Sequence, residues 1–239
     1  MNTILKILYN PVKAFRELKS SEKFPVMSLI LLLIVVIINN ILMIPVTFKV
    51  LELTFSSIQI PLNDAQTDRM ESVMQMTYKL RYLQVVGAVF SYLFMLVIYT
   101  LIIWILTKIA KQSLSFSKAF ELIIHCCFIL TIGALVNTFI LYGQGIENIR
   151  NIYEVSLTGL NLLTSSEQVG VTFYTFLTLI NPFYVWFLVL LTLGLATLAD
   201  LKIVKAFVTA FIFWAILIAF PVVMIYFSQL LMQKSGLVA

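Results

Sequence analysis

Glu121 and His125 are the two residues whose types and spacing most directly suggest chemistry. They lie four residues apart in "FELIIHCCFILT", so a helix places both on one face, where an ion pair or a hydrogen bond can form. His125 is the only histidine of the chain. An ionisable pair in a membrane can handle protons or a ligand, and it can equally be a structural pair. We therefore treat both residues as a candidate polar site.

Metal binding needs more ligands than Glu121 and His125 supply. Cys126 and Cys127 follow directly, but neighbouring residues on a helix point about 100° apart, so we expect two buried thiols without a mutual disulfide. The sequence has no Gly-rich phosphate loop and no nucleophile–base spacing. It therefore predicts no catalytic residue, no metal and no cofactor, and a protein that is not an enzyme.

Asn39 and Asn40 form a second candidate group, because they interrupt a long apolar stretch. Polar side chains within a bilayer need partners. Hydrogen bonding between helices meets that need, and so does contact with a polar ligand. We keep both hypotheses.

Asp200, Lys202 and Lys205 lie together between two apolar runs and form the third group. One interpretation is a solvated turn in which Asp200 caps the helix that follows. The other is a docking patch for a partner or for lipid headgroups, extended by lysines at 108, 111 and 118.

The elements that carry these residues are expected to lie in a membrane. Of the 239 residues, 61% are hydrophobic and 11% are charged, whereas soluble domains carry about 25% charged residues. An integral membrane protein is the class that fits this composition. The lipid bilayer is thus an expected partner, and nucleic acid is not, because no polar domain is present to bind it.

We predict an all-α polytopic membrane protein with five transmembrane helices, since each span needs about 20 mostly apolar residues. A cytoplasmic segment over 1–24 precedes the membrane domain over 25–231, and a tail follows over 232–239. The spans are predicted at about 25–48, 85–106, 119–141, 182–199 and 203–230.

Basic residues predict the orientation of these spans. With a cytoplasmic N-terminus, most of the 16 lysines and arginines fall on the inner side, including those of the two short connections. Because Lys and Arg favour the cytoplasmic side, we predict the N-terminus inside and the C-terminus outside. The location would be the inner, cytoplasmic membrane of a bacterium.

The stretch "NPVKAFRELKSSEKFP" before the first span predicts a short amphipathic helix, capped by Asn10 and begun by Pro11. Val12, Phe15 and Leu18 recur every third residue and share one face. This helix can lie on an anionic inner leaflet, or it can pack under the bundle with its charges in water.

Residues 171–199 are apolar throughout, and Pro182 divides them. The division suggests either a discontinuous helix of the kind that forms transport sites, or a plain span that begins at the break. Val171 to Ile180 is too short to cross a bilayer, whereas 182–199 is just long enough. We therefore predict that Asn181 caps and Pro182 starts the fourth span, with 171–180 at the outer face.

Three stretches resemble the prokaryotic branch of the Ypt/Rab-interacting protein (Yip) family. They are "NPVKAFRELKSSEKFP", "KQSLSFSKAFELI" and "INPFYVWFLVLLTLGLATLADLKIVKAF". The resemblance implies a five-span protein with a cytoplasmic N-terminus and no established catalytic residues. The chain lacks the Asp-Leu-Tyr-Gly-Pro motif and the long polar N-terminal domain of eukaryotic members, so binding of a Rab GTPase is not expected.

The resemblance implies an interaction or accessory protein that assembles with itself or with another membrane protein such as an efflux transporter. Small residues at four-residue spacing, Gly87 and Ser91, would allow close helix contact in such an assembly. The alternative is a small transporter, channel or lipid-moving protein with a polar site near Glu121 and His125.

Overall fold

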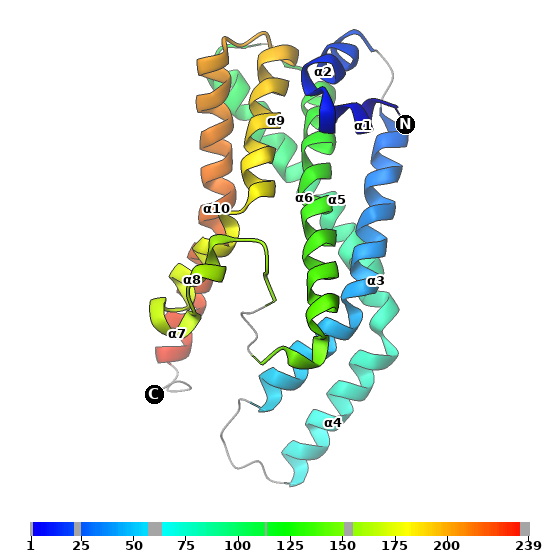
Figure 1. The fold of residues 1–239 in the computed structure, drawn as a ribbon, viewed down its shortest axis with the longest axis vertical. Coiled ribbons are helices and arrows are strands. Elements are labelled where there is room, and N and C mark those ends of the chain that lie inside the picture. Colours follow the sequence, from blue (N-terminus) through cyan, green and yellow to red (C-terminus); the bar gives the residue numbers. More distant parts are fainter. Residues whose placement is uncertain (1, 22–24, 57–63, 113, 151–154, 235–239) are drawn as a thin grey trace.

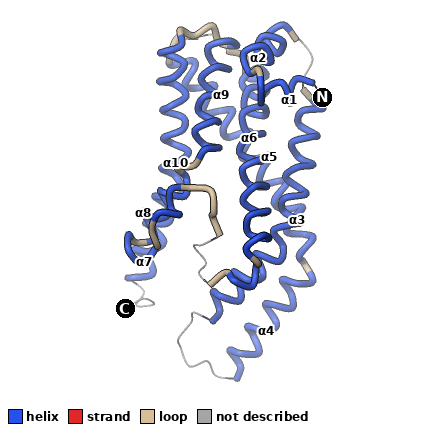
Figure 2. The backbone as a smooth tube through the Cα atoms, viewed as in Figure 1, coloured by secondary structure: helices blue, strands red, loops and turns tan. Residues whose placement is uncertain are grey.

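The computed structural model describes residues 2–21, 25–56, 64–112, 114–150 and 155–234. All regular structure in this part of the chain is helical, which confirms the all-α prediction (Figures 1 and 2). The helices are α1 (Asn2–Tyr9), α2 (Pro11–Ser20), α3 (Val26–Ser56), α4 (Asp64–Lys79), α5 (Arg81–Ile109), α6 (Phe116–Gln144), the 3-10 helices η1 (Ile146–Asn148) and η2 (Leu160–Leu163), α7 (Ser166–Val169), α8 (Val171–Leu179), α9 (Pro182–Leu198) and α10 (Ile203–Lys234).

Four of the described helices, α3, α5, α6 and α10, are long and apolar enough to cross a membrane. The pair α8 and α9 passes the same test together, with a bend of 52° at the break. The described residues thus supply four spans, or five if the bent pair is one span. The helices also extend past several predicted boundaries: α3 continues to Ser56 and α10 to Lys234, and the rest of the predicted tail lies outside the described residues.

α6 is the central helix of the bundle, and α3, α5 and α9 pack around it (Figure 1). In its apolar segment 67% of the residues are buried by protein, against 17–22% in the other three long helices. Nine consecutive residues, Glu121 to Ile129, are buried. Because a lipid-facing helix would expose one side, this run shows that protein surrounds the first half of α6 on all sides.

α1 and α2 cover one end of the bundle, together with the α5–α6 and α9–α10 connections (Figure 1). We call this the N-terminal end; α4, α7 and the last described turns of α10 lie toward the opposite end. Asn10 accepts a hydrogen bond from Lys13 N at 3.2 Å and Pro11 begins α2, as predicted.

The face of α2 that contains Ala14, Phe15 and Leu18 is buried, while Lys13 and Arg16 are exposed. Phe15 lies against Gly194 of α9: a Cβ at this glycine would collide with Leu122 Cδ1 and come within 3.2 Å of the Phe15 ring. Gly194 therefore provides the space into which Phe15 fits. These contacts correspond to the interpretation in which the helix packs on the bundle with its charges in water.

The break before α9 forms as the sequence predicted. Asn181 Oδ1 accepts hydrogen bonds from Phe183 N and Tyr184 N, both at 3.0 Å, and Pro182 occupies the first turn of α9. The preceding segment is itself a helix, α8, which packs on α10 and η2. The carbonyl of Ile180 accepts from Leu160 N at 3.1 Å, so the freed backbone at the break is used within the protein.

Candidate functional site

Lys118 joins α6 to α2 at the N-terminal end. It lies in the first turn of α6, where its ammonium donates to Glu121 Oε2 at 2.8 Å, to Leu18 O at 2.7 Å and to Ser21 O. The last carbonyls of a helix lack intrahelical donors and carry partial negative charge, so a cation there stabilises the C-terminus of α2. The same cation balances Glu121, which is only 2% exposed.

His125 continues this polar chain toward α3. Its Nδ1 is 2.7 Å from Glu121 O, and its Nε2 is 3.2 Å from Ser28 Oγ. A carbonyl oxygen can only accept, so Nδ1 carries a hydrogen, and Nε2 of the neutral ring accepts from the Ser28 hydroxyl. Glu121 and His125 are thus joined through the backbone of Glu121, while its carboxylate binds Lys118.

Asp200 also binds α2. In place of the predicted helix cap, its carboxylate pairs with the Lys19 ammonium. Lys202 and Lys205 are exposed beside it. The first backbone hydrogen bond of α10 runs from Ala206 N to Lys202 O at 2.9 Å.

Exposed cations lie at this end on α2, in the α5–α6 connection, in the α9–α10 connection and at the start of α10. We call them the basic platform, and it consists of Lys13, Arg16, Lys111, Lys202 and Lys205. Two carboxylates at this end are each in an ion pair: Glu17 with Lys6 at 2.8 Å, and Asp200 with Lys19. The platform is therefore a positively charged surface at the N-terminal end.

Asn39 and Asn40 lie elsewhere, in a cavity of about 260 Å³ between α3, α5, α6 and α9. Asn39 Oδ1 accepts from Thr138 Oγ1 of α6 at 2.8 Å, and Asn40 Nδ2 donates to Val36 O of its own helix at 2.9 Å. Asn39 thus makes the hydrogen bond between helices that the sequence suggested. Both asparagines also face open space beside Tyr92.

The predicted residues form two separate groups rather than one site. Asn39 meets α6 at Thr138, which is 13 residues beyond His125. At 1.5 Å per residue the two places on α6 are about 20 Å apart. Glu121, His125 and Asp200 belong to the N-terminal end, whereas Asn39 and Asn40 line a cavity between four helices.

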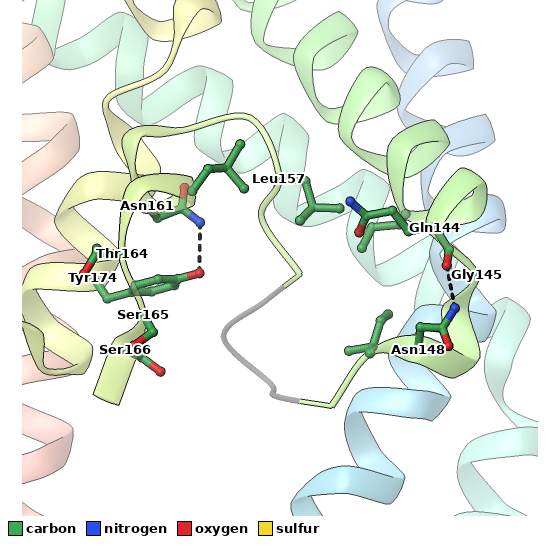
Figure 3. Close-up of a pocket in the computed structure, with 12 residues that line it drawn as sticks. Gln144, Gly145, Asn148, Leu157, Asn161, Thr164, Ser165, Ser166 and Tyr174 are labelled. Carbon is green, nitrogen blue, oxygen red and sulfur yellow. Dashed lines mark hydrogen bonds between the residues drawn. The ribbon is translucent and has the colours of Figure 1, made fainter. Parts of the chain in front are cut away.

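A further cavity, of about 240 Å³, lies at the opposite end (Figure 3). Asn161 Nδ2 donates to Tyr174 OH at 3.0 Å on one side, and Asn148 Nδ2 donates to Gln144 O at 2.7 Å on the other. Its described lining mixes polar and aliphatic side chains and carries no charged side chain.

Within the part of the chain that the structure describes, no group of three His, Cys, Asp or Glu residues converges on a point that a metal ion could occupy. Cys126 and Cys127 are free thiols and completely buried. His125 has protein partners at both ring nitrogens. The described side chains of Lys118, Glu121 and His125 at the N-terminal end thus form hydrogen bonds and a charge pair with protein groups.

Sequence reasoning assigned Lys118 to a docking patch and did not identify it as the partner of Glu121. Lys118 lies three residues before Glu121 and seven before His125, a helical spacing that could have placed all three on one face. Ser28 and the Thr138 partner of Asn39 have no such local signal, because helix packing alone brings them in. The role of Gly194 likewise depends on Phe15, which lies far away in the sequence.

These apolar helices define a multi-pass integral membrane protein. Residues 5–224 match the Yip1 domain, so the chain belongs to the Yip1 domain family, and the predicted resemblance is confirmed. Neither a curated protein nor a solved structure matches the chain.

Proposed function

We propose that this chain is a non-enzymatic interaction or accessory protein of the bacterial inner membrane. It assembles with itself or with another membrane protein such as an efflux transporter, and it follows the prokaryotic branch of the family in having five spans. The observation that carries the proposal is the basic platform, which the packing of α2 holds at one end of the bundle.

The platform suits a docking role because its support is fixed. Phe15 is completely buried, and Lys118 binds two carbonyls at the end of α2. A partner therefore meets preformed charges and need not order a mobile segment on binding, which lowers the entropic cost of association. An acidic segment at the membrane surface of a partner protein is the complementary surface.

The same charges support a cytoplasmic N-terminal end. Lys and Arg favour the inner side of the membrane, and anionic lipids of the inner leaflet attract them by about 1 kcal/mol for each side chain. In this orientation α10 ends outside, and α9 serves as the fourth span with α8 at the outer face.

Crosslinking in native membranes followed by purification in mild detergent tests the proposal. The wild-type chain is expected to recover a second copy or a distinct membrane protein. Neutralising the platform with Arg16→Gln and Lys202→Gln should reduce that recovery several-fold, because both cations face the partner.

The matched control is Lys79→Gln with Arg150→Gln, which removes two exposed cations far from α2. Recovery should then equal that of the wild type. The proposal fails if the chain is always a lone monomer and no crosslinked partner is found, or if both double variants behave alike.

A transporter, channel or lipid-moving function centred on Glu121 and His125 is the alternative. The hydrogen bonds of both side chains to protein groups favour a structural role for the pair. Flux and lipid-scrambling assays in proteoliposomes decide between the two functions. Activity in the wild type that is lost in a folded His125→Gln variant would favour the alternative, whereas repeated absence of activity would remove it.

A further inference from the structure

A groove of about 550 Å³ lies between the end of α5 and the start of α10, at the N-terminal end of the bundle. Two lysines line it: Lys111, which follows α5, and Lys205, which lies in the first turn of α10. The rest of the described lining is apolar except for Thr209. The groove therefore combines positive charge at one end with an apolar surface along the two helices.

The apolar part of the groove lies on the outside of two membrane-crossing helices. Val204, Val208 and Ile212 recur every four residues on α10 and are 70%, 50% and 43% exposed. Ile212 lies seven residues beyond Lys205, which is about 10 Å along the helix. The hydroxyl of Thr209 donates to Lys205 O at 2.9 Å, so it is already paired. This part of the groove therefore suits a hydrocarbon chain.

The charged end of the groove is positive and has no counter-charge among the described residues. Lys111 and Lys205 are exposed, and neither is in an ion pair with a described carboxylate. Three carboxylates of the N-terminal end have other partners: Glu17 binds Lys6, Glu121 binds Lys118 and Asp200 binds Lys19. Because α5 ends and α10 begins here, their helix dipoles oppose each other, and the lysines supply the net charge.

The two parts of the groove together select its occupant. A free anion makes no use of the apolar part, and an extended peptide would bring backbone N–H and C=O groups against side chains that cannot pair with them. A zwitterionic lipid head carries its own ammonium, which the lysines repel. We propose that this groove binds an anionic phospholipid, with its phosphate at Lys111 and Lys205 and an acyl chain along Val208 and Ile212.

This lipid site goes beyond the proposed docking function and does not depend on it, because lipid binding requires no partner protein. The docking test neutralises Arg16 and Lys202, and neither residue lines the groove. Recovery of a crosslinked partner reports docking, whereas lipid labelling of the purified chain reports the groove. Failure of one proposal therefore leaves the other intact.

Photocrosslinking tests the proposal directly. The full chain is reconstituted in phosphatidylcholine vesicles that contain a small fraction of phosphatidylglycerol with a photoactivatable acyl chain, and labelled peptides are mapped by mass spectrometry. Labels are expected on the groove segments 106–110 and 204–212. A phosphatidylcholine with the same photoactivatable chain, at the same fraction, should label these segments several-fold less. Added salt should reduce the difference between the two lipids, because it screens the lysines.

Charge variants test the head of the lipid. Lys111→Gln and Lys205→Gln should each reduce labelling by phosphatidylglycerol about fivefold, the ratio that corresponds to ~1 kcal/mol for each cation near an anionic lipid. Lys111→Arg with Lys205→Arg keeps both charges and should retain labelling. Lys13→Gln with Arg16→Gln is the matched control, because it removes the same charge from α2, outside the groove, and labelling should stay close to that of the wild type.

Val208→Trp tests the chain of the lipid, since it should fill the apolar part and lower labelling while both lysines remain. Val185→Trp on α9 is its control, because both valines are 50% exposed but Val185 lies outside the groove lining.

Gel filtration confirms that each variant is folded, and the comparison of the two lipids decides on the wild-type chain alone if one is not. The proposal is overturned if phosphatidylcholine labels the groove segments equally well. It is also overturned if the glutamine variants at 111 and 205 or Val208→Trp label like the wild type, or if the α2 control lowers labelling as much as they do.

Discussion

The two halves of α6 differ in how the rest of the chain surrounds them. The first half contains the uninterrupted buried run from Glu121 to Ile129, and its Lys118 binds the end of α2. In the second half, buried residues alternate with exposed ones such as Val136 and Phe139, and the helix borders two cavities. Protein therefore encloses the first half of α6, which we call the closed end, whereas the second half borders open space.

The difference shows how polar residues behave in each setting. At the N-terminal end, Lys118, Glu121 and His125 bind one another's groups and the end of α2. Beside the second half, Asn39 and Asn40 each make one side-chain hydrogen bond to a described residue. Side chains of the closed end should thus contribute more to stability than those of the cavity.

Among the variants that compare the two halves, Phe15→Ala should lower the thermal unfolding midpoint most. It empties the buried space that the Phe15 ring fills beside Gly194, and removing a buried Phe typically costs about 3–5 kcal/mol. Thermal unfolding in detergent should show a large decrease in midpoint. The control Phe90→Ala removes a ring that is 69% exposed on α5 and should change the midpoint little.

Lys118→Met should follow, with a loss of about 3 kcal/mol, because it leaves the buried Glu121 carboxylate without its cation and α2 without a donor. Adding Glu121→Gln removes the unpaired negative charge and should recover part of the lost thermal unfolding midpoint. If Lys118→Met unfolds at the wild-type temperature, the hydrogen bonds of Lys118 do not stabilise the packing of α2.

Gly194→Val should cost about 1–3 kcal/mol, since the new side chain collides with Leu122. Gly87→Val is its counterpart, because a Cβ at Gly87 meets nothing within 4 Å. Thermal unfolding in detergent should show a lower midpoint for Gly194→Val and an unchanged midpoint for Gly87→Val. Equal midpoints would contradict the close packing at Gly194.

Asn39→Leu and Asn40→Leu should have the smallest effect on stability, below about 1 kcal/mol each, because hydrogen bonds between membrane helices are weak on average. Their midpoints should stay close to that of the wild type. Losses as large as that of Phe15→Ala would show that the cavity side chains hold the fold, and would remove the contrast between the halves.

Much of the fold was predictable because membrane helices are specified by local composition. The apolar runs located α3, α5, α6 and α10, and the Asn-Pro pairs at 10–11 and 181–182 marked the starts of α2 and α9. Helix ends were less predictable, since polar residues such as Lys49 and Glu52 continue α3 past its apolar part.

The polar groups were predictable only where their partners lie nearby in the sequence. The helical spacing of Glu121 and His125 placed them on one face, but the link to Ser28 depends on the packing of α3 against α6. Asp200 was expected to cap α10, whereas its carboxylate pairs with Lys19, 181 residues away. The cavity beside Asn39 depends on Tyr99 and Tyr184 from two other helices.

The central claim is that α2 is fixed on the bundle. Its most direct test is a crosslink between α2 and the α9–α10 connection. Lys19→Cys and Asp200→Cys place thiols at positions whose native side chains are in contact, while Cys126 and Cys127 are buried and unreactive. A short bis-maleimide applied to membranes should join residues 19 and 200 within one chain, detected as a linked peptide by mass spectrometry. Lys19→Cys with Arg150→Cys should give none. If the 19–200 pair links no more than this control, α2 is not fixed on the bundle and the account of the closed end is wrong.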